Sequence, residues 1–491
     1  MHICISLFHY ILFRLRHVKI IVWMGILLCS KHNSINNCLN ISAVYALCRK
    51  HLVKTTLFRK KRLIMKIVFY LPNKNLKGID CTRLEEGNPG IGGTEYIIQA
   101  TVHYLHKLSP KDINIILGLE DEHGVSDTLK PFVKTSSIKE LIKETNPDYI
   151  VFKYENCTYH KIADATRNTK TKLLPWAHNF IPRTQLTKLA KDSKVARIIC
   201  VSKEQLNMYR DHKAFFKSVY IYNGMPVTYL EQQRESLPPF INRPNEVTYI
   251  GSIVDFKGFH LLAKAWPKVL KQVPDARLNV IGSGKLYDRT AKLGPYGIAE
   301  ASYEAQFMPY LIDANGKLLP SVKFWGVLGT EKNDILKRTR VGVPNPSGIS
   351  ETFCITALEM QAMGALITTI KFGGFVNTVY HTGLLYRCPN ELADCIVKQM
   401  HKKDNDLDGF YAYMKENFSF EKVAANWIKL CRDLEYGNFE PLSYEDSPDP
   451  LLRLRERNRR IKAALPCGYL LPTIDLYRSI LKRIKLWPYD E

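Results

Sequence analysis

Hydrophobic and polar positions alternate in a regular way from Lys66 onward. Short apolar runs rich in β-branched and aromatic residues are separated by segments whose apolar positions follow a helical period. This alternation is typical of βα units around a parallel sheet. It occurs twice, on either side of residues 235–246, which are rich in proline and polar residues, as expected of a linker between domains. The sequence therefore predicts an α/β protein with two doubly wound, Rossmann-like domains that face a cleft.

The apolar runs predict the strands of two sheets. The first series is 66–72, 113–119, 148–153, 172–178, 197–202 and 219–224, and the second is 247–253, 277–284, 322–329, 341–347 and 365–370. In such sheets ligands bind beyond the carboxyl ends of the strands, so chemistry is expected in the loops that follow these runs. Residues 285–320 form a connection longer than two such elements require, and the sequence gives it no role.

The formal charge of +23 is unevenly distributed. Residues 1–64 hold eleven Lys and Arg and no Asp or Glu. A second cluster, which would present a basic face if it were helical, comprises Arg453, Arg455, Arg457, Arg459, Arg460 and Lys462. Anionic lipid, a phosphorylated acceptor and RNA all attract such surfaces, but no nucleic-acid-reading module is recognisable. We therefore expect no nucleic acid partner, and we rank peripheral contact with anionic membrane first.

The N-terminal segment and the cysteines bear on location. Residues 18–29 form an apolar run shorter than the roughly 20 residues of a spanning helix. Residues 1–64 are consistent with a signal-like segment, with an interfacial anchor, or with an extension outside the fold, since Met65 opens a run typical of a first strand. The twelve cysteines form neither a CxxC pair nor a Cys/His cluster, which predicts a reduced cytoplasmic protein without a metal site.

Residues 346–364 carry the strongest chemical pattern: strand, glycine turn, helix and glycine stop. Ser347 or Ser350 can cap the predicted helix, and Gly364 suits its end. Free N–H groups near Glu351 would then form an anion site for a diphosphate.

Glu351 and Glu359 are eight positions apart, which in one helix separates them by about 12 Å along the axis and about 80° around it. They cannot share a proton, but they can contact opposite ends of one extended ligand. Glu359 would bind vicinal hydroxyls such as those of ribose, and Glu351 would lie near a sugar. The alternative for Glu359 is an exposed helix residue, although its neighbours in the sequence are apolar.

These residues resemble the retaining glycosyltransferases of family 4, which have the GT-B fold. The resemblance runs from about Lys66 to Leu434 and rests on a glutamate, seven residues and a second glutamate, followed by Met363-Gly364. Segments 371–376, 381–385 and 418–430 resemble the family's Gly-Gly loop, Thr-Gly-Leu-Leu strand and closing helix. The resemblance implies that Glu351 contacts the transferred sugar, that Glu359 contacts the nucleotide ribose, and that the anomeric configuration is retained.

The chain departs from this family at one position. Where the family has Gly-Arg after the strand that opens the second domain, this chain has Gly251-Ser252, although the following Lys257-Gly258 is present. A positive charge that faces the phosphates should stabilise the leaving diphosphate, so the departure puts the phosphate clamp or full activity in doubt. Lys337 or Arg338 could substitute. For Lys257 the alternative is a solvated surface lysine.

The first domain offers a glycine loop, 90–93, and a histidine at a strand end. The loop can approach a phosphate or sugar closely and Thr94 can cap the helix after it, although a plain tight turn is the alternative. His178 closes an apolar strand where the family often has a histidine near the transferred sugar; a structural histidine is the alternative. The candidate catalytic residues are Glu351, His178 and Lys257, and the candidate donor-binding residues are Glu359, Gly92, Gly93, Gly251, Ser252, Gly282, Ser350, Thr352 and Phe353.

We therefore expect a cytoplasmic hexosyltransferase, peripheral at the inner membrane face, that uses a nucleoside-diphosphate sugar and neither metal nor cofactor. Its acceptor would be a glycan or a lipid-linked molecule in surface polysaccharide assembly. The alternatives are a nucleotide-sugar epimerase and an inactive nucleotide-sugar binding protein. The expected parts are an N-terminal extension (1–64), an acceptor-side domain (65–235), a nucleotide-sugar-binding domain (236–425), a crossover helix (426–440) and a basic C-terminal tail (441–491).

Overall fold

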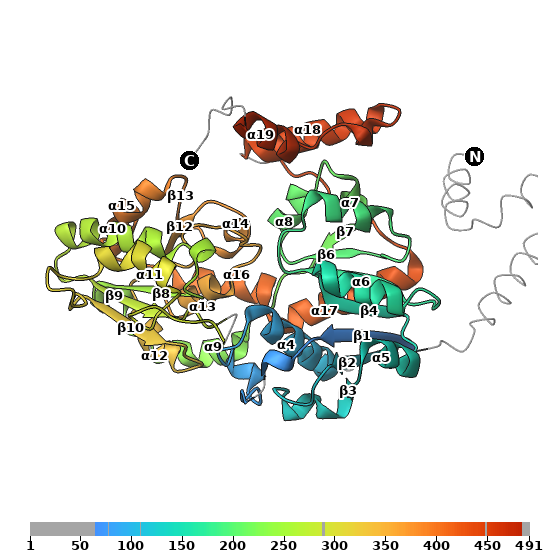
Figure 1. Cartoon of the computed structure of the whole chain (residues 1–491), viewed down its shortest axis with the longest axis horizontal. Helices are drawn as coiled ribbons and strands as arrows, with labels where there is room; N and C mark the ends of the chain where they lie inside the picture. The colour runs from blue at the N-terminus through green and yellow to red at the C-terminus, as the bar shows by residue number, and fades with distance from the viewer. Residues whose placement is uncertain (1–63, 77, 109, 287–289, 447–448, 484–491) are drawn as a thin grey trace, which may run out of the picture. The chain divides into compact units, whose positions relative to one another are not determined.

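The computed structural model describes residues 64–483 except 77, 109, 287–289 and 447–448 (Figure 1). The interpretations of residues 1–63 as a leader or an anchor lie outside the described residues. Within the described part of the chain, no helix combines the length and apolarity needed to cross a bilayer.

The first half of the described chain forms a seven-stranded parallel sheet in the order β3-β2-β1-β4-β5-β6-β7. Its strands are β1 (Met65–Leu71), β2 (Ile113–Leu119), β3 (Val133–Thr135), β4 (Tyr149–Lys153), β5 (Lys172–Ala177), β6 (Ile198–Cys200) and β7 (Ser218–Tyr220). Its main helices are α4 (Gly93–Leu108), α5 (Ile138–Thr145), α6 (Asn156–Ala165), α7 (Arg183–Lys191) and α8 (Lys203–Met208). Residues of β1 alternate between two cores, Phe69 on one face and Tyr70 on the other, as helices on both faces require.

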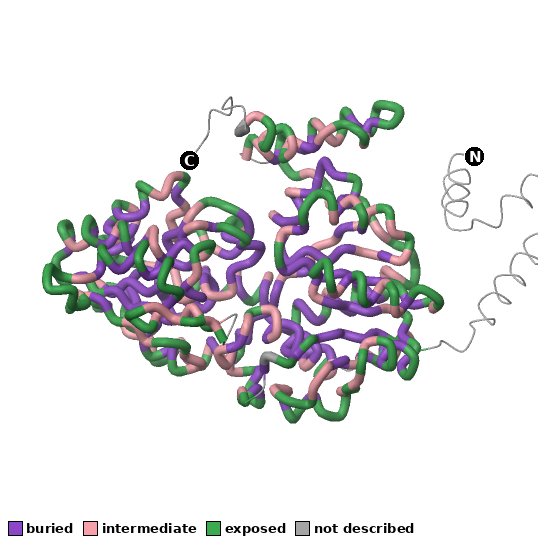
Figure 2. Tube along the Cα trace, in the orientation of Figure 1, coloured by how far each residue is buried: buried purple, intermediate pink, exposed green. Residues whose placement is uncertain are grey.

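The second half forms a six-stranded parallel sheet in the order β10-β9-β8-β11-β12-β13. Its strands are β8 (Glu246–Ile250), β9 (Arg277–Ile281), β10 (Val322–Gly326), β11 (Val341–Gly342), β12 (Leu366–Ile370) and β13 (Leu384–Tyr386). The helices between them include α10 (Phe259–Gln272), α11 (Ala301–Phe307), α12 (Lys332–Leu336), α13 (Ile355–Ala362), α14 (Phe375–Thr378) and α15 (Leu392–Met400). The prediction of two doubly wound sheets is confirmed, and Figure 2 traces the strands of both mainly through buried residues.

The long connection 285–320 folds around one buried carboxylate. Glu304, on α11, is 1% exposed and accepts the backbone N–H groups of Tyr296, Ile298 and Ala299. Because a carboxylate buried away from water must be satisfied by donors, Glu304 holds this connection together as a structural residue.

After the second sheet the chain returns to the first. Helix α16 (Leu407–Phe418) leads into α17 (Phe420–Tyr436), whose N-cap Ser419 accepts the N–H of Lys422. Trp427 of α17 packs edge-to-face on Phe69, with ring centroids 5.1 Å apart, and on Trp176, at 4.8 Å. The aromatic contacts tie the end of the second series of elements to the core of the first sheet.

Two further helices, α18 (Pro450–Ala464) and α19 (Ile474–Arg483), follow (Figure 1). Asp449 caps α18 and Pro450 occupies its first turn. The prediction of one basic face that includes all six arginines and lysines of this segment is wrong. Arg455 and Lys462 are each 2% exposed, because α18 packs this side against the first half of the chain.

Candidate active site

One cleft, with a volume of about 520 Å³, brings together all twelve predicted site residues. They come from the start of α4 and the loop before it, the loops after β5, β8 and β9, the turn before α10, and α13 with the segment that leads into it. The carboxyl ends of parallel strands from both sheets thus border the same cavity, where ligands bind in such sheets.

The segment before α13 differs from its predicted shape. The helix begins at Ile355 rather than at Glu351, and its N-cap is Cys354. Ser350 has a φ of 59° and Ser347 donates its hydroxyl to Phe256 O, so neither serine caps the helix. The N–H of Glu351 donates to Gly348 O and is therefore not free for an anion; any free N–H groups lie at the start of α13 instead.

The turns in this segment place the Glu351 carboxylate inside the cleft. Its Oε2 accepts Lys257 Nζ at 3.0 Å and Asn345 Nδ2 at 2.9 Å, and the residue is 8% exposed. The Gly-Gly loop, residues 371–376, holds the backbone of this residue, because Gly374 N–H donates to Glu351 O. At Gly373, with a φ of 54°, an added Cβ would lie 2.1 Å from the same carbonyl oxygen, so only glycine fits.

Glu359 forms a second pair with a lysine that the sequence analysis missed. Lys332 Nζ lies 3.0 Å from Glu359 Oε1, and both residues are 7–8% exposed at the cleft. Lys332 begins α12, and no feature of the sequence around it distinguished it from other lysines. The suggested substitutes do not reach the site: among the residues that line the cleft neither Lys337 nor Arg338 appears, and Arg338 pairs with Glu246 at 3.6 Å.

Ser252 supplies no charge to the cleft. It is 1% exposed, and its hydroxyl donates to Ser283 O at 3.3 Å. Beside it the backbone turns meet directly: an added Cβ at Gly282 would lie 1.8 Å from Gly251 O. Gly282, with a φ of 139°, therefore serves the close approach of two loops at this end of the cleft.

His178 follows β5 and is 9% exposed. Among the described residues its Nε2 has no hydrogen-bond partner, while its carbonyl accepts the hydroxyl of Thr352 from the other half of the chain. Burial, with a smaller effect of Lys153, lowers the pKa of His178 to about 3. The imidazole is therefore neutral near pH 7 and can hydrogen-bond to a ligand.

The glycine loop is held by an asparagine. Asn88 Oδ1 accepts the N–H groups of Gly90 and Ile91, and α4 begins at Gly93, so Thr94 lies inside the helix and does not cap it. Glu95 also lines the cleft. The sequence did not predict it, because only the glycines before it were predicted to contact a ligand.

The charged lining of the cleft is balanced, with the lysines 153, 257 and 332 and the glutamates 95, 351 and 359. A ligand that carries a diphosphate would bring negative charge to lysines that already face carboxylates. Within the described residues, no group of three or more His, Cys, Asp or Glu side chains could hold a metal ion.

Part of the second half of the chain is similar to a known protein family. Residues 244–402, which contain Lys257, Lys332 and both cleft-lining glutamates of the motif, match the family model described as glycosyl transferases group 1. The chain is a glycosyltransferase, and its residues 244–402 are similar to group 1. No curated protein matches the sequence.

Solved structures agree with the glycosyltransferase fold. The Anabaena protein Alr3699/HepE in complex with UDP-glucose superposes with a TM-score of 0.54 at 15% identity, covering 75% of this chain and 100% of that chain. A structure described as trehalose-6-phosphate from E. coli bound with UDP-2-fluoro glucose gives a TM-score of 0.51 at 12% identity, covering 77% of this chain and 100% of that chain. The two-sheet architecture of this glycosyltransferase is thus the GT-B fold.

Proposed function

We propose that this glycosyltransferase moves a hexose-type sugar from a nucleoside-diphosphate sugar to a hydroxyl of a glycan or lipid-linked acceptor, with retention at the anomeric carbon, in surface polysaccharide assembly. The observation that carries the proposal is the presence of two buried lysine–glutamate pairs in one cleft, Lys257–Glu351 and Lys332–Glu359.

The two pairs suit the two ends of an extended donor. Glu351 is fixed by Lys257 and Asn345 and offers its remaining lone pairs to hydroxyls of the transferred sugar. Glu359 offers an acceptor to the vicinal hydroxyls of a ribose. Lys257 Nζ, paired with Glu351, would face the diphosphate between them, where a fixed positive charge stabilises a leaving group that gains negative charge.

The proposed reaction follows one face of the sugar. The bond between the anomeric carbon and the diphosphate oxygen breaks, and the acceptor oxygen bonds to the anomeric carbon on the face that the diphosphate leaves. The proton of the acceptor hydroxyl passes to the departing phosphate oxygen, so no protein base is consumed. The neutral imidazole of His178 would hydrogen-bond to the sugar through Nε2, whose position in the cleft is without a protein partner among the described residues.

The donor class is supported by similarity of fold. The Anabaena protein, similar over its whole length, binds UDP-glucose. We therefore infer a uridine- or related nucleoside-diphosphate hexose as the first donor to test. Ser252, which brings no charge, makes an inactive nucleotide-sugar binding protein the main competing hypothesis.

The test is a screen of the full-length protein with a panel of nucleoside-diphosphate sugars and mixed acceptors, read by mass spectrometry. We expect one donor to be consumed with transfer or hydrolysis, and the anomeric proton coupling of the product in NMR to report retention. Glu351→Gln should lose turnover, whereas Glu416→Gln, at an exposed glutamate, should keep it.

Three results would contradict the proposal in different ways. Donor binding without turnover would support the inactive binder, and conversion of the donor to an isomer of the same mass would support an epimerase. Absence of any donor binding would show that the cleft has been assigned wrongly.

A further inference from the structure

Helix α18 and the turn after it present an apolar and cationic surface that the glycosyltransferase reaction does not use. Leu454 and Ile461 are 44% and 45% exposed and lie seven positions apart, on one side of the helix. Leu465 and Leu470, just beyond the helix, are 49% and 84% exposed. Arg457 and Arg460 are exposed beside them. We call these six residues the α18 outer surface.

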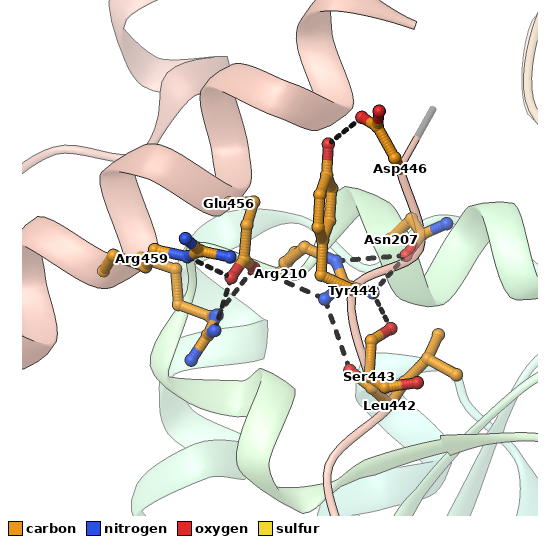
Figure 3. A network of polar contacts seen from close by, with 9 residues as sticks. Asn207, Arg210, Leu442, Ser443, Tyr444, Asp446, Glu456 and Arg459 are labelled. Atoms are coloured by element: carbon orange, nitrogen blue, oxygen red, sulfur yellow. Dashed lines mark hydrogen bonds and ion pairs between the residues drawn. The ribbon is translucent and has the colours of Figure 1, made fainter. Parts of the chain in front are cut away.

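The charges of α18 are sorted between its two sides. Its single acidic residue, Glu456, is 3% exposed and faces the first half of the chain, where it meets Arg210 at 3.4 Å and Arg459 at 2.6 Å (Figure 3). Arg455 and Lys462 are also turned inward. The outer side therefore carries large apolar side chains and two arginines, of which Arg460 also pairs with the buried Glu456 at 2.9 Å. Arg457 forms no ion pair with any described residue.

The charge of the α18 outer surface distinguishes between the partners that could cover it. The N-terminal residues 1–63 carry only positive charge, so electrostatic repulsion disfavours them as a cover for the surface. A second copy of the same surface would oppose arginines to arginines. A bilayer that contains anionic lipid satisfies both features, because the leucine and isoleucine side chains enter the region between headgroups and acyl chains while the arginines meet lipid phosphates.

We propose that the α18 outer surface docks this enzyme on the surface of a bilayer that contains anionic lipid. The contact lies outside the cleft and is independent of which donor or acceptor the cleft binds. It replaces the basic face expected from the sequence with a mixed surface, in which Arg455 and Lys462 have no part because they are buried.

The test is flotation of the full-length protein with phosphatidylcholine vesicles, with and without phosphatidylglycerol. Leu454→Ser/Ile461→Ser should weaken binding to the anionic vesicles by about tenfold or more, because two apolar anchors are lost. Arg457→Gln should weaken it by about fivefold and remove part of its salt dependence. Matched controls are Leu318→Ser/Ile241→Ser, exposed apolar positions elsewhere, and Lys271→Gln/Lys317→Gln.

Each result bears on the proposal. Binding lost in both α18 variants, kept in both controls, with unchanged thermal unfolding and unchanged donor turnover in detergent-free solution, would support it. Anionic-vesicle binding that neither variant alters would overturn it and assign the contact to another segment, such as residues 1–63. Absence of binding by the parent protein would also overturn it, as would loss of dimerisation or of RNA binding as the main effect of the variants. Donor turnover is measured separately, so failure of the membrane contact and failure of the proposed transfer reaction remain distinguishable.

Discussion

The cleft and the contact between α18 and the first half of the chain both bury charged groups, but the charged groups have different numbers of partners. At the α18 contact Glu456 meets Arg210 and Arg459 (Figure 3), and it also pairs with a third arginine, Arg460. In the cleft Glu351 and Glu359 each meet one lysine. Among the described residues, His178 Nε2 and Asn223 Oδ1 in the cleft have no partner.

The number of partners distinguishes a structural charge cluster, at α18, from a cluster that can bind a ligand, in the cleft. Burial alone would raise the pKa of Glu456, but hydrogen bonds from Arg459 and Arg460 lower it to about 2. A carboxylate that already accepts several charge-assisted hydrogen bonds has little capacity left for a substrate. The cleft keeps acceptors and one ring nitrogen available, at a cost in stability that a bound donor would offset.

The largest effect is expected where the charge cluster is complete. Glu456→Gln leaves Arg210, which is 2% exposed, without its buried counter-charge. Breaking a buried ion pair in this way costs about 3–5 kcal/mol, which urea unfolding of the full-length protein would measure. Glu416→Gln, at an exposed position, should change stability by less than about 0.5 kcal/mol. A Glu456 variant as stable as its control would show that the α18 contact does not depend on this cluster.

In the cleft the corresponding change should affect catalysis. Lys257→Met removes the cation that faces Glu351 and the proposed diphosphate, and we expect kcat to fall by about 10²–10³-fold because the leaving group loses a fixed positive charge. Steady-state kinetics with the donor found in the screen would measure it. Lys271→Met, at an exposed lysine, should keep kcat. A Lys257 variant with unchanged kcat would show that the lysine does not stabilise the leaving diphosphate.

The repeating apolar runs were enough to predict both sheets, because buried parallel strands leave a strong local pattern. β2 was predicted with its observed bounds. β3 was missed since three residues are too few for a pattern, and β11 stops at Gly342 because Pro344 and Pro346 lack the N–H groups that a strand donates.

The sequence predicted residues that line the cleft, but it did not predict how they contact one another. The motif spacing predicted Glu351 and Glu359, yet the start of α13 was placed four residues early. The left-handed backbone at Ser350, which residues other than Gly, Asn and Asp rarely adopt, has no signal in the sequence. Lys332 could not be found, because its position opposite Glu359 depends on how α12 packs against α13. The inward turn of Glu456 depends in the same way on tertiary packing.

A smaller effect is expected for Lys332, whose role the sequence did not indicate. Lys332→Gln should raise KM for the donor by about tenfold, or roughly 1.4 kcal/mol, because Glu359 loses the charged partner that orients it toward a ribose. Lys337→Gln, five residues further on, is the matched control and should leave KM unchanged. If Lys337→Gln instead raised KM more than Lys332→Gln, the pairing of Lys332 with Glu359 would not be the one that serves donor binding.

The smallest effect concerns two buried histidines, one in each region. Burial lowers the pKa of His178 to about 3 and that of His212, near the α18 contact, to about 4. Both are neutral in the folded protein, whereas in the unfolded chain a histidine binds a proton below about pH 6.5. The unfolded state therefore holds more protons between these values, so stability is full above about pH 6.5 and falls as the pH decreases toward the folded pKa.

Replacing either histidine with asparagine should remove its share of this pH dependence, about 0.7 kcal/mol between pH 7 and pH 6 by urea unfolding. At pH 7 the two variants should differ. His212 accepts the N–H of Ala214 and contacts the Thr187 hydroxyl, so His212→Asn should cost about 1 kcal/mol or more, whereas the Nε2 of His178 has no such bond to lose. Equal losses at pH 7 would show that the ring of His178 is held as firmly as that of His212, and the cleft would then lack the unused hydrogen-bonding capacity that sets it apart from the α18 contact.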